Sequence, residues 1–413
     1  MTVTTKPSKY WMFTNEFTQD PFPILEYIRS QGPVCEVPLP GAGRAWVITR
    51  YEEAKEALAD PRLSRDIHYH YRLIAERTGQ RMMPPAEISN HLANLEPPRH
   101  TPLRRAISFA FTPRRAEAMR SKVEAMADEL LDGLADQAEP DLISGYADPL
   151  PVIAIAALMG VPAESWPDFL HWSNALRAAD AGSGEMERTT RELSTYLSAL
   201  IARKEKEPGD DLISALIHAD ADNRLTGTEI LSTAFALMTG GNDTTASLVG
   251  GVLGTFLTHP QERDRLLAEP GSWGTAMDEL IRYVSPIGNT LQRATTEPVT
   301  IGATTIPAGE IVIISVISAN RDERRTPHPD ELDLDREKPA HLSFGFGIHY
   351  CSGAHLAKVI TEVGTRRVFE RFPDVRLAVD PSELRYQQNV VTRPLETLPV
   401  RWSADDATSR GVG

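Results

Sequence analysis

The feature that most constrains the fold is one long, largely apolar run between Thr226 and His259. Thr226 and Glu229 form a capping box, which is a strong signal for the start of a helix. Pro260 follows His259 and ends the pattern. A helix of about 30 residues, at about 1.5 Å per residue, is on the order of 45 Å long. A helix of that length crosses a whole domain, so the rest of the chain must pack around it.

The centre of this predicted helix is polar and contains two glycines. It reads Thr239-Gly240-Gly241-Asn242-Asp243-Thr244-Thr245. Each glycine costs about 1 kcal/mol relative to alanine in a helix, and buried polar side chains are costly unless they are paired. Either the helix kinks here and turns a polar face to solvent, or a ligand lies against its centre.

Composition and charge exclude several classes of protein. The 413 residues are 41% hydrophobic and 24% charged, the balance of a folded globular chain. A net charge of −14 does not suit binding to nucleic acid or to an anionic membrane. The longest apolar stretch, Val152 to Val161, is too short to span a bilayer, and Met1 to Tyr10 has no signal-type apolar region. We therefore expect a cytoplasmic protein. We also expect it to be a monomer.

We expect one domain over residues 1–413, and hydrophobic periodicity predicts a mainly α (α+β) architecture for it. The elements expected are a strand pair at 35–37 and 45–49, helices through 103–268, strands at 299–301, 305–306 and 311–317, a helix after Cys351, and short strands near the C-terminus.

The second strong signal is a glycine-rich loop around one of only two cysteines. It runs from Phe344 to Gly353 and contains Cys351. Three glycines so close together indicate that the backbone passes near something flat or bulky. Cys351 lies just before a predicted helix, where the helix dipole favours a thiolate. Cys35, the other cysteine, is interpreted as a small hydrophobic residue near a strand.

Three kinds of chemistry can use such a cysteine. A zinc site needs about four ligands, and only His355 stands at the i+4 position. A nucleophilic cysteine needs a base, and His349 is only two residues away. A single thiolate ligand on haem iron accounts for the lone cysteine, the glycines and the long helix together.

The loop resembles a known signature. Phe344-x-x-Gly347-x-His349-x-Cys351-x-Gly353 is similar to the haem-binding motif of the cytochrome P450 superfamily. Companion motifs occur in the order and at the spacing of that family: His100-x-x-x-Arg104, Gly240-Gly241-x-Asp243-Thr244-Thr245, Glu279-x-x-Arg282, Arg293 and Ala319-Asn320-Arg321-Asp322. The resemblance extends from about Pro21 to Trp402, and it implies the P450 fold, with a long central helix over the haem and small peripheral sheets.

The resemblance also implies roles for these residues. Cys351 would ligate the iron of haem b, with Phe344, Gly353 and Gly240 next to the cofactor. Asp243 and Thr244 would relay protons during the activation of dioxygen, while Glu279 and Arg282 would be structural. The haem propionates would be held by His100, Arg104, Arg293 and His349, because a buried carboxylate needs partners.

Three positions depart from the family pattern. Ser352 stands where an apolar residue usually follows the cysteine, and Phe346 where histidine is common. The segment 329–332 lacks the arginine that often joins the Glu-x-x-Arg pair. Either Arg324 or Arg336 takes that place, or the triad is incomplete.

The function expected from the resemblance is a haem-thiolate monooxygenase. It would insert one oxygen atom from O2 into an apolar small molecule, such as a polyketide or macrolide, terpenoid or aromatic intermediate of secondary metabolism, by hydroxylation or epoxidation. The alternatives are oxidative coupling, peroxide-driven oxidation and non-catalytic haem binding. An intact Asp243–Thr244 pair argues against the last two.

A basic segment indicates where electrons would enter. Residues 99–122 hold seven basic side chains and one acid, Glu117, in an otherwise acidic chain. In the family this region lies on the cysteine side of the haem. An acidic ferredoxin, reduced by a ferredoxin reductase with NAD(P)H, would be steered to it; the alternative is a solvated basic helix face.

Overall fold

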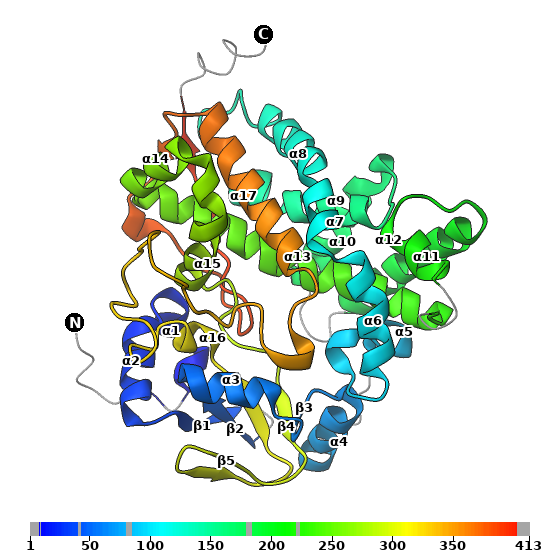
Figure 1. The fold of residues 1–413 in the computed structure, drawn as a ribbon, viewed down its shortest axis with the longest axis vertical. Coiled ribbons are helices and arrows are strands. Elements are labelled where there is room, and N and C mark those ends of the chain that lie inside the picture. The colour runs from blue at the N-terminus through cyan, green and yellow to red at the C-terminus, as the bar shows by residue number, and fades with distance from the viewer. Residues whose placement is uncertain are drawn as a thin grey trace. The chain divides into compact units, whose positions relative to one another are not determined.

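The computed structural model describes residues 8, 10–39, 43–79, 85–178, 184–219 and 224–402 (Figure 1). They belong to two compact units, each made of discontinuous segments. The first unit takes its residues from 1–83, 251–351 and 381–396, and the second from 84–250, 352–380 and 397–413. A single domain over 1–413 remains a prediction.

The first unit is built on a five-stranded sheet with the strand order β1-β2-β7-β4-β3. The strands are β1 (Val34–Leu39), β2 (Gly43–Ile48), β7 (Ile311–Ile314), β4 (Arg293–Thr295) and β3 (Leu63–Ser64). The predicted strand pair near the N-terminus is confirmed, because β1 and β2 are antiparallel with Cys35 opposite Val47. Strand β2 then pairs in parallel with β7.

Strand β7 shows why this sheet is buried on both sides. All four of its residues are buried, and successive side chains point to opposite faces. Val312 and Ile314 join one hydrophobic cluster, together with Leu58 of helix α3 (Tyr51–Ala59). Ile311 and Ile313 join a second cluster on the other face. The run of β-branched residues therefore stabilises two layers at once.

The predicted strand over 311–317 is too long. It ends at Ile314, and Val316–Ala319 form the short helix α16. The N–H of Ser315 donates to the carbonyl of Ile48, the last residue of β2, at 2.8 Å. No further residue of β2 is available for pairing, so the chain turns into a helix despite its β-branched side chains. The neighbouring prediction holds, since β5 (Val299–Ile301) and β6 (Thr304–Ile306) form a hairpin.

Helices complete the first unit. They are η1 (Trp11–Phe13), α1 (Asn15–Gln19), α2 (Phe22–Gln31), α3, α4 (Ile67–Thr78), α14 (Pro260–Ala268), η6 (Pro270–Ser272), α15 (Trp273–Val284), α16, η7 (Gly347–His349) and η8 (Pro381–Glu383).

The second unit is mainly helical, as predicted. Its helices are α5 (Ala86–Ser89), η2 (Leu92–Asn94), α6 (His100–Ala110), α7 (Pro113–Ala118), α8 (Arg120–Asp132), η3 (Ile143–Ala147), α9 (Pro149–Leu158), η4 (Ala163–Ser165), α10 (Trp166–Ala178), α11 (Glu185–Lys206), α12 (Leu212–Ile217) and α17 (Ala354–Arg371). A two-stranded pair, β8 (Arg376–Leu377) with β9 (Val400–Arg401), confirms the short strands expected near the C-terminus.

The predicted long helix is α13 (Gly227–Thr258), 32 residues long, and it contributes to both units. Its capping box is formed as expected. The backbone N–H of Thr226 donates to Glu229 Oε2 at 2.8 Å, and the N–H of Glu229 donates to Thr226 Oγ1 at 3.2 Å. The helix is continuous through Gly240 and Gly241.

Helix α17, which follows Cys351 in the chain, is held on two sides within the second unit. It lies beside α8 (Figure 1), and four ion pairs join the two helices at successive turns. These pairs are Arg120–Glu362, Glu124–Arg366, Asp128–Arg367 and Asp132–Arg371. Against α9, a Cβ at Gly364 would lie 2.7 Å from Leu150 Cδ2, so the two backbones approach closely.

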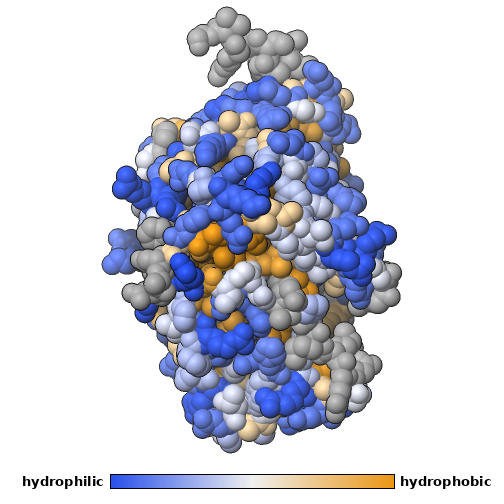
Figure 2. Space-filling model, turned by 90° about the vertical axis from the view of Figure 1, so that its right-hand side faces the viewer, coloured by the Kyte–Doolittle hydropathy of each residue, from blue (hydrophilic) through white to orange (hydrophobic). Residues whose placement is uncertain are grey.

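Figure 2 shows one face of the molecule, on which hydrophilic residues surround a central area of hydrophobic ones. Within the described ranges, we find no helix with both the length and the apolar character required to cross a membrane.

Candidate functional site

The predicted site residues belong to both units. The first unit holds Glu279, Arg282, Arg293, Phe344, His349 and Cys351, and the second holds His100, Arg104, Gly240, Asp243, Thr244 and Gly353. Each group is described within its own unit.

A closed loop positions Cys351. The backbone N–H of Cys351 donates to the carbonyl of Phe344 at 2.9 Å, which closes the loop across its glycines. Gly345 and Gly347 have φ angles of +71° and +76°, in the left-handed region that favours glycine. A Cβ at Gly347 would also lie 3.2 Å from Ala59 Cα, at the end of α3. Glycine is therefore required at position 347 for both conformation and space.

The two cysteines have different environments. Cys35 lies in β1, and burial raises the pKa of its thiol to about 12, so this sulfur stays protonated. Cys351 forms no disulfide and is exposed at the end of its loop. Cys351 is thus the accessible sulfur of the pair, and Cys35 fits its interpretation as a small hydrophobic residue.

The set of possible metal ligands fits haem. In the part of the chain that the structure describes, no three His, Cys, Asp or Glu side chains gather as they would around a bare metal ion. Cys351 offers a single sulfur donor, and haem suits such a donor because it needs only one thiolate ligand from the protein.

Arg293 and His349, two of the predicted propionate ligands, lie on short elements of the first unit. Arg293 begins β4, is buried, and donates from Nη1 to the carbonyl of Leu63 in β3 at 3.0 Å. His349 ends η7, two residues before Cys351. Their contact with haem propionates remains a prediction.

In the second unit, His100 and Arg104 lie one turn apart on α6. His100 is buried, and Arg104 donates from Nη1 to Ser352 Oγ at 2.8 Å. This bond gives a physical role to one departure from the family pattern, since an apolar residue at position 352 could not accept it. Propionate binding by these two residues is likewise still a prediction.

The centre of α13 has the local geometry expected of its sequence. Thr244 Oγ1 donates to the carbonyl of Gly240 at 3.0 Å, as its i+4 position predicts. A Cβ at Gly240 would meet no atom within 4 Å, so there is open space beside this turn. Burial raises the pKa of Asp243, while the charge of Arg177 on α10 acts in the opposite direction. A carboxyl group of this kind can hold a proton closer to neutral pH.

The Glu279–Arg282 pair is buried in the first unit. Arg282 donates from Nε and Nη2 to the two carboxylate oxygens of Glu279 at 2.7 and 2.8 Å, and both side chains are fully buried. The third member of the network is Arg336, whose Nε donates to Glu279 Oε1 at 3.2 Å. Arg324, the other candidate, pairs instead with Glu53.

Asn320 joins this network to the segment that precedes Cys351. Its carbonyl accepts from Arg282 at 3.1 Å, and its side-chain oxygen accepts from the N–H of Leu342 at 2.8 Å. Its amide nitrogen donates to Ser343 Oγ at 3.0 Å. The network therefore anchors the chain only two residues before the cysteine loop begins.

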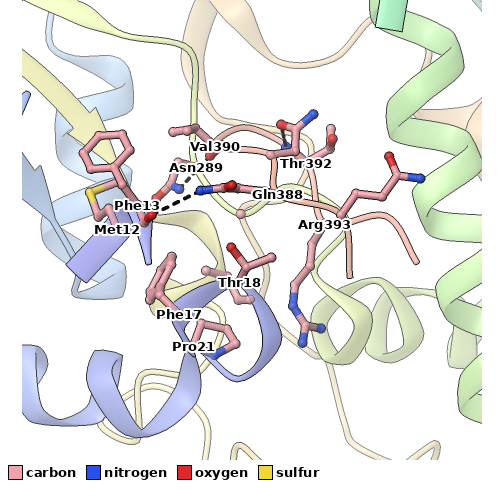
Figure 3. Close-up of a pocket in the computed structure, with 14 residues that line it drawn as sticks. Met12, Phe13, Phe17, Thr18, Pro21, Asn289, Gln388, Val390, Thr392 and Arg393 are labelled. Atoms are coloured by element: carbon pink, nitrogen blue, oxygen red, sulfur yellow. Dashed lines mark hydrogen bonds between the residues drawn. The ribbon is translucent and has the colours of Figure 1, made fainter. Parts of the chain in front are cut away.

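Two features were not predicted from the sequence. One is Arg177 on α10 in the second unit, and the other is a small cavity of about 40 Å³ in the first unit (Figure 3). The cavity lies between the N-terminal segment and the C-terminal loop, where Gln388 Nε2 donates to the carbonyl of Phe13 at 3.1 Å. None of the predicted site residues lines it. No local pattern marks either feature, because each is formed by segments far apart in the chain.

Comparisons with known proteins identify relatives that extend over nearly the whole chain. Residues 275–397 match the family model for Cytochrome P450. Cytochrome P450 107B1 of Saccharopolyspora erythraea is 39% identical over 94% of this chain and 96% of its own length. The 6-deoxyerythronolide B hydroxylase of the same organism is 36% identical, covering 94% and 97%. The solved structure of PksS, a bacillaene polyketide synthase cytochrome P450 of Bacillus subtilis, has a TM-score of 0.86 at 34% identity, covering 95% and 99%.

We predict that removing the third member of the buried network is costly. Arg336→Met deletes a charged hydrogen bond to the buried Glu279 and should lower the free energy of unfolding by about 1.5–3 kcal/mol. Arg324→Met is the control: its side chain is 52% exposed, and exposed ion pairs contribute about 0.2–1 kcal/mol. Denaturant titration of both variants measures the difference. Equal losses would contradict the assignment of Arg336.

Proposed function

The chain belongs to the cytochrome P450 family, and we propose that this haem-thiolate monooxygenase uses haem b and hydroxylates or epoxidises a polyketide intermediate of secondary metabolism. The observation that carries the proposal is the exposed Cys351 in a closed glycine loop directly before α17. When bound, haem supplies the iron centre that activates dioxygen.

The residues of this chain would hold the cofactor as follows. Cys351 would provide the thiolate ligand, with Phe344 and Gly353 on either side of it in the loop. His100, Arg104, Arg293 and His349 would donate to the propionates. Arginine suits this task because its planar guanidinium can bind a carboxylate through two hydrogen bonds.

Asp243 and Thr244 would move protons at the centre of α13. The hydroxyl of Thr244 bonds to the carbonyl of Gly240, so it can exchange this acceptor for a water molecule without moving the helix. The half-buried carboxyl of Asp243 has its pKa raised by burial, which suits a group that takes up and releases protons. The open space at Gly240 leaves room for such a water.

The substrate class is inferred from relatives. One relative is a 6-deoxyerythronolide B hydroxylase, and a similar structure is a polyketide synthase cytochrome P450. Each is matched over more than nine tenths of both chains. An apolar polyketide is therefore the substrate class to test first.

Electrons would come from a ferredoxin and its NAD(P)H-dependent reductase. In the basic segment 99–122, the side chains of Arg99, Arg105, Arg114 and Lys122 are exposed. Arg120 forms ion pairs with Glu117 and Glu362, so it adds little to the positive electrostatic potential at the surface. The exposed members remain a basic surface on an acidic protein, which suits an acidic partner.

We predict that Cys351 is the iron ligand. Reduced protein with carbon monoxide should show the red-shifted Soret band of a thiolate-ligated haem, because thiolate raises the electron density at the iron. Cys351→His should lose that band, while the control Cys35→Ser should keep it. A wild-type band at the position typical of His-ligated haem would contradict the proposal.

We predict that Thr244 and Asp243 act after substrate binds. Thr244→Ala and Asp243→Asn should keep the substrate-induced spectral shift but lower the product formed per NAD(P)H by about tenfold or more, because a positioned proton donor is lost. Thr255→Ala is a matched control, since Thr255 Oγ1 makes the same bond to a glycine carbonyl, that of Gly251, on the same helix. Unchanged product yield in both variants would refute the relay.

We predict that the basic segment receives the ferredoxin. Reversing Arg114 and Arg115 to glutamate should slow ferredoxin-supported reduction about tenfold at low salt and flatten its salt dependence, because the Debye length is only about 10 Å at 0.1 M. The control reverses Arg203 and Lys206, two exposed basic residues of α11. A reduction rate unaffected by either salt or charge reversal places the docking surface elsewhere.

A further inference from the structure

One arginine in the second unit lies at different distances from two carboxylates. Arg177 on α10 places Nη1 3.0 Å from Asp148 Oδ2, just before α9, within hydrogen-bonding distance. Its Nε lies 4.0 Å from Asp243 Oδ1 on α13, which is beyond a hydrogen bond. All three side chains are partly buried, with exposed fractions of 19% for Arg177, 20% for Asp148 and 36% for Asp243. Their charges are therefore only partly screened by solvent.

Close packing fixes the helix that carries Asp243. A Cβ at Gly241 would lie 2.6 Å from Ile155 Cδ1, so α13 is in tight contact with α9. The side-chain nitrogen of Asn242 donates to Ser173 Oγ on α10 at 3.4 Å. Because these two residues immediately precede Asp243, its backbone is held between the elements that carry Asp148 and Arg177. With the backbone held in this way, rotation of the side chains is enough to change how the three charges are shared.

The charges around Asp243 act in opposite directions. Burial raises its pKa most, Arg177 lowers the pKa, and Asp148 raises it. Asp148 also has a raised pKa, with burial the main cause, Arg177 acting against it and Asp141 with it. A full ion pair with Arg177 would favour the ionised form of Asp243, because an opposite charge within about 4–6 Å lowers a carboxyl pKa by about 1–3.

We propose that Asp148 is a positioning residue that engages Arg177, prevents it from forming a full ion pair with Asp243, and so leaves Asp243 able to exchange protons. The proposal deepens the relay described above and rests on it. Asp148 touches no substrate in this scheme. It acts through the guanidinium of Arg177. By binding this group, Asp148 keeps Arg177 Nε 4.0 Å from Asp243 Oδ1, which is too far for a hydrogen bond.

The test measures the titration of Asp243 directly. The infrared carbonyl band of its protonated carboxyl, identified by its loss in Asp243→Asn, is followed against pH in the purified protein. Asp148→Asn should lower the titration midpoint by about one pH unit, because Arg177, which keeps its hydrogen bond to Asn174 on the same helix, can then pair more closely with Asp243. Arg177→Gln should raise the midpoint instead. Asp148→Glu keeps the charge and should leave the midpoint near that of the unmodified protein.

Asp168→Asn provides the matched control, because it removes one exposed carboxylate from the same helix as Arg177. A midpoint in Asp148→Asn equal to that in Asp168→Asn would overturn the positioning role, even if Asp243→Asn still lowers product yield. Conversely, a shifted midpoint together with full product yield in Asp243→Asn would support the positioning role and refute the relay. In Asp148→Asn, product per NAD(P)H should fall at neutral pH and recover as the pH is lowered toward the new midpoint.

Discussion

The fully buried pair of Glu279 and Arg282 is the interaction on which the first unit depends most. Two charges without solvent are tolerated only when every hydrogen bond is satisfied. Arg282 meets this condition by giving its donors to Glu279 and to the carbonyls of Asn320, Pro329 and Glu331. Those carbonyls belong to the irregular segment between β7 and the cysteine loop. The ion pair thus organises a segment that has little regular structure of its own, and through Asn320 it holds the start of the loop that presents Cys351.

The parts of the fold that could be predicted are those encoded by neighbouring residues. The capping box at Thr226 determines where α13 starts, and alternation along β7 determines which residues enter each core. The cysteine loop could be predicted for the same reason, since its glycines, its cysteine and the start of the following helix lie close together in the sequence. The prediction of a strand over 311–317 was wrong after Ile314, because pairing with other strands decides where a strand ends. Its last residues favour a strand, but the partner strand β2 ends at Ile48 and leaves them no ladder to join.

The parts that could not be predicted depend on residues distant in sequence. Arg324 and Arg336 are equally plausible partners for Glu279 by composition and spacing, and only the folded chain separates them. Asp148, Arg177 and Asp243 come from three different helical regions, each separated from the next by at least 29 residues. Ser352 was recognised as a departure from the family pattern, but its partner, Arg104, is 248 positions away. Identifying such contacts from sequence requires knowing which helix faces pack together.

Arginine side chains in this protein show how the number of acceptors determines what a charge can do. Arg282 has five hydrogen bonds, matching its five N–H groups, and it cannot turn without breaking one. It is therefore suited to hold a structure still. Arg177 has a close carboxylate at 3.0 Å and a second at 4.0 Å, so a modest rotation of its side chain would redistribute its charge between them. Arg282 is linked through Asn320 to the segment that precedes the cysteine loop, where rigidity is required. Arg177 lies beside Asp243, the carboxyl that must change its charge.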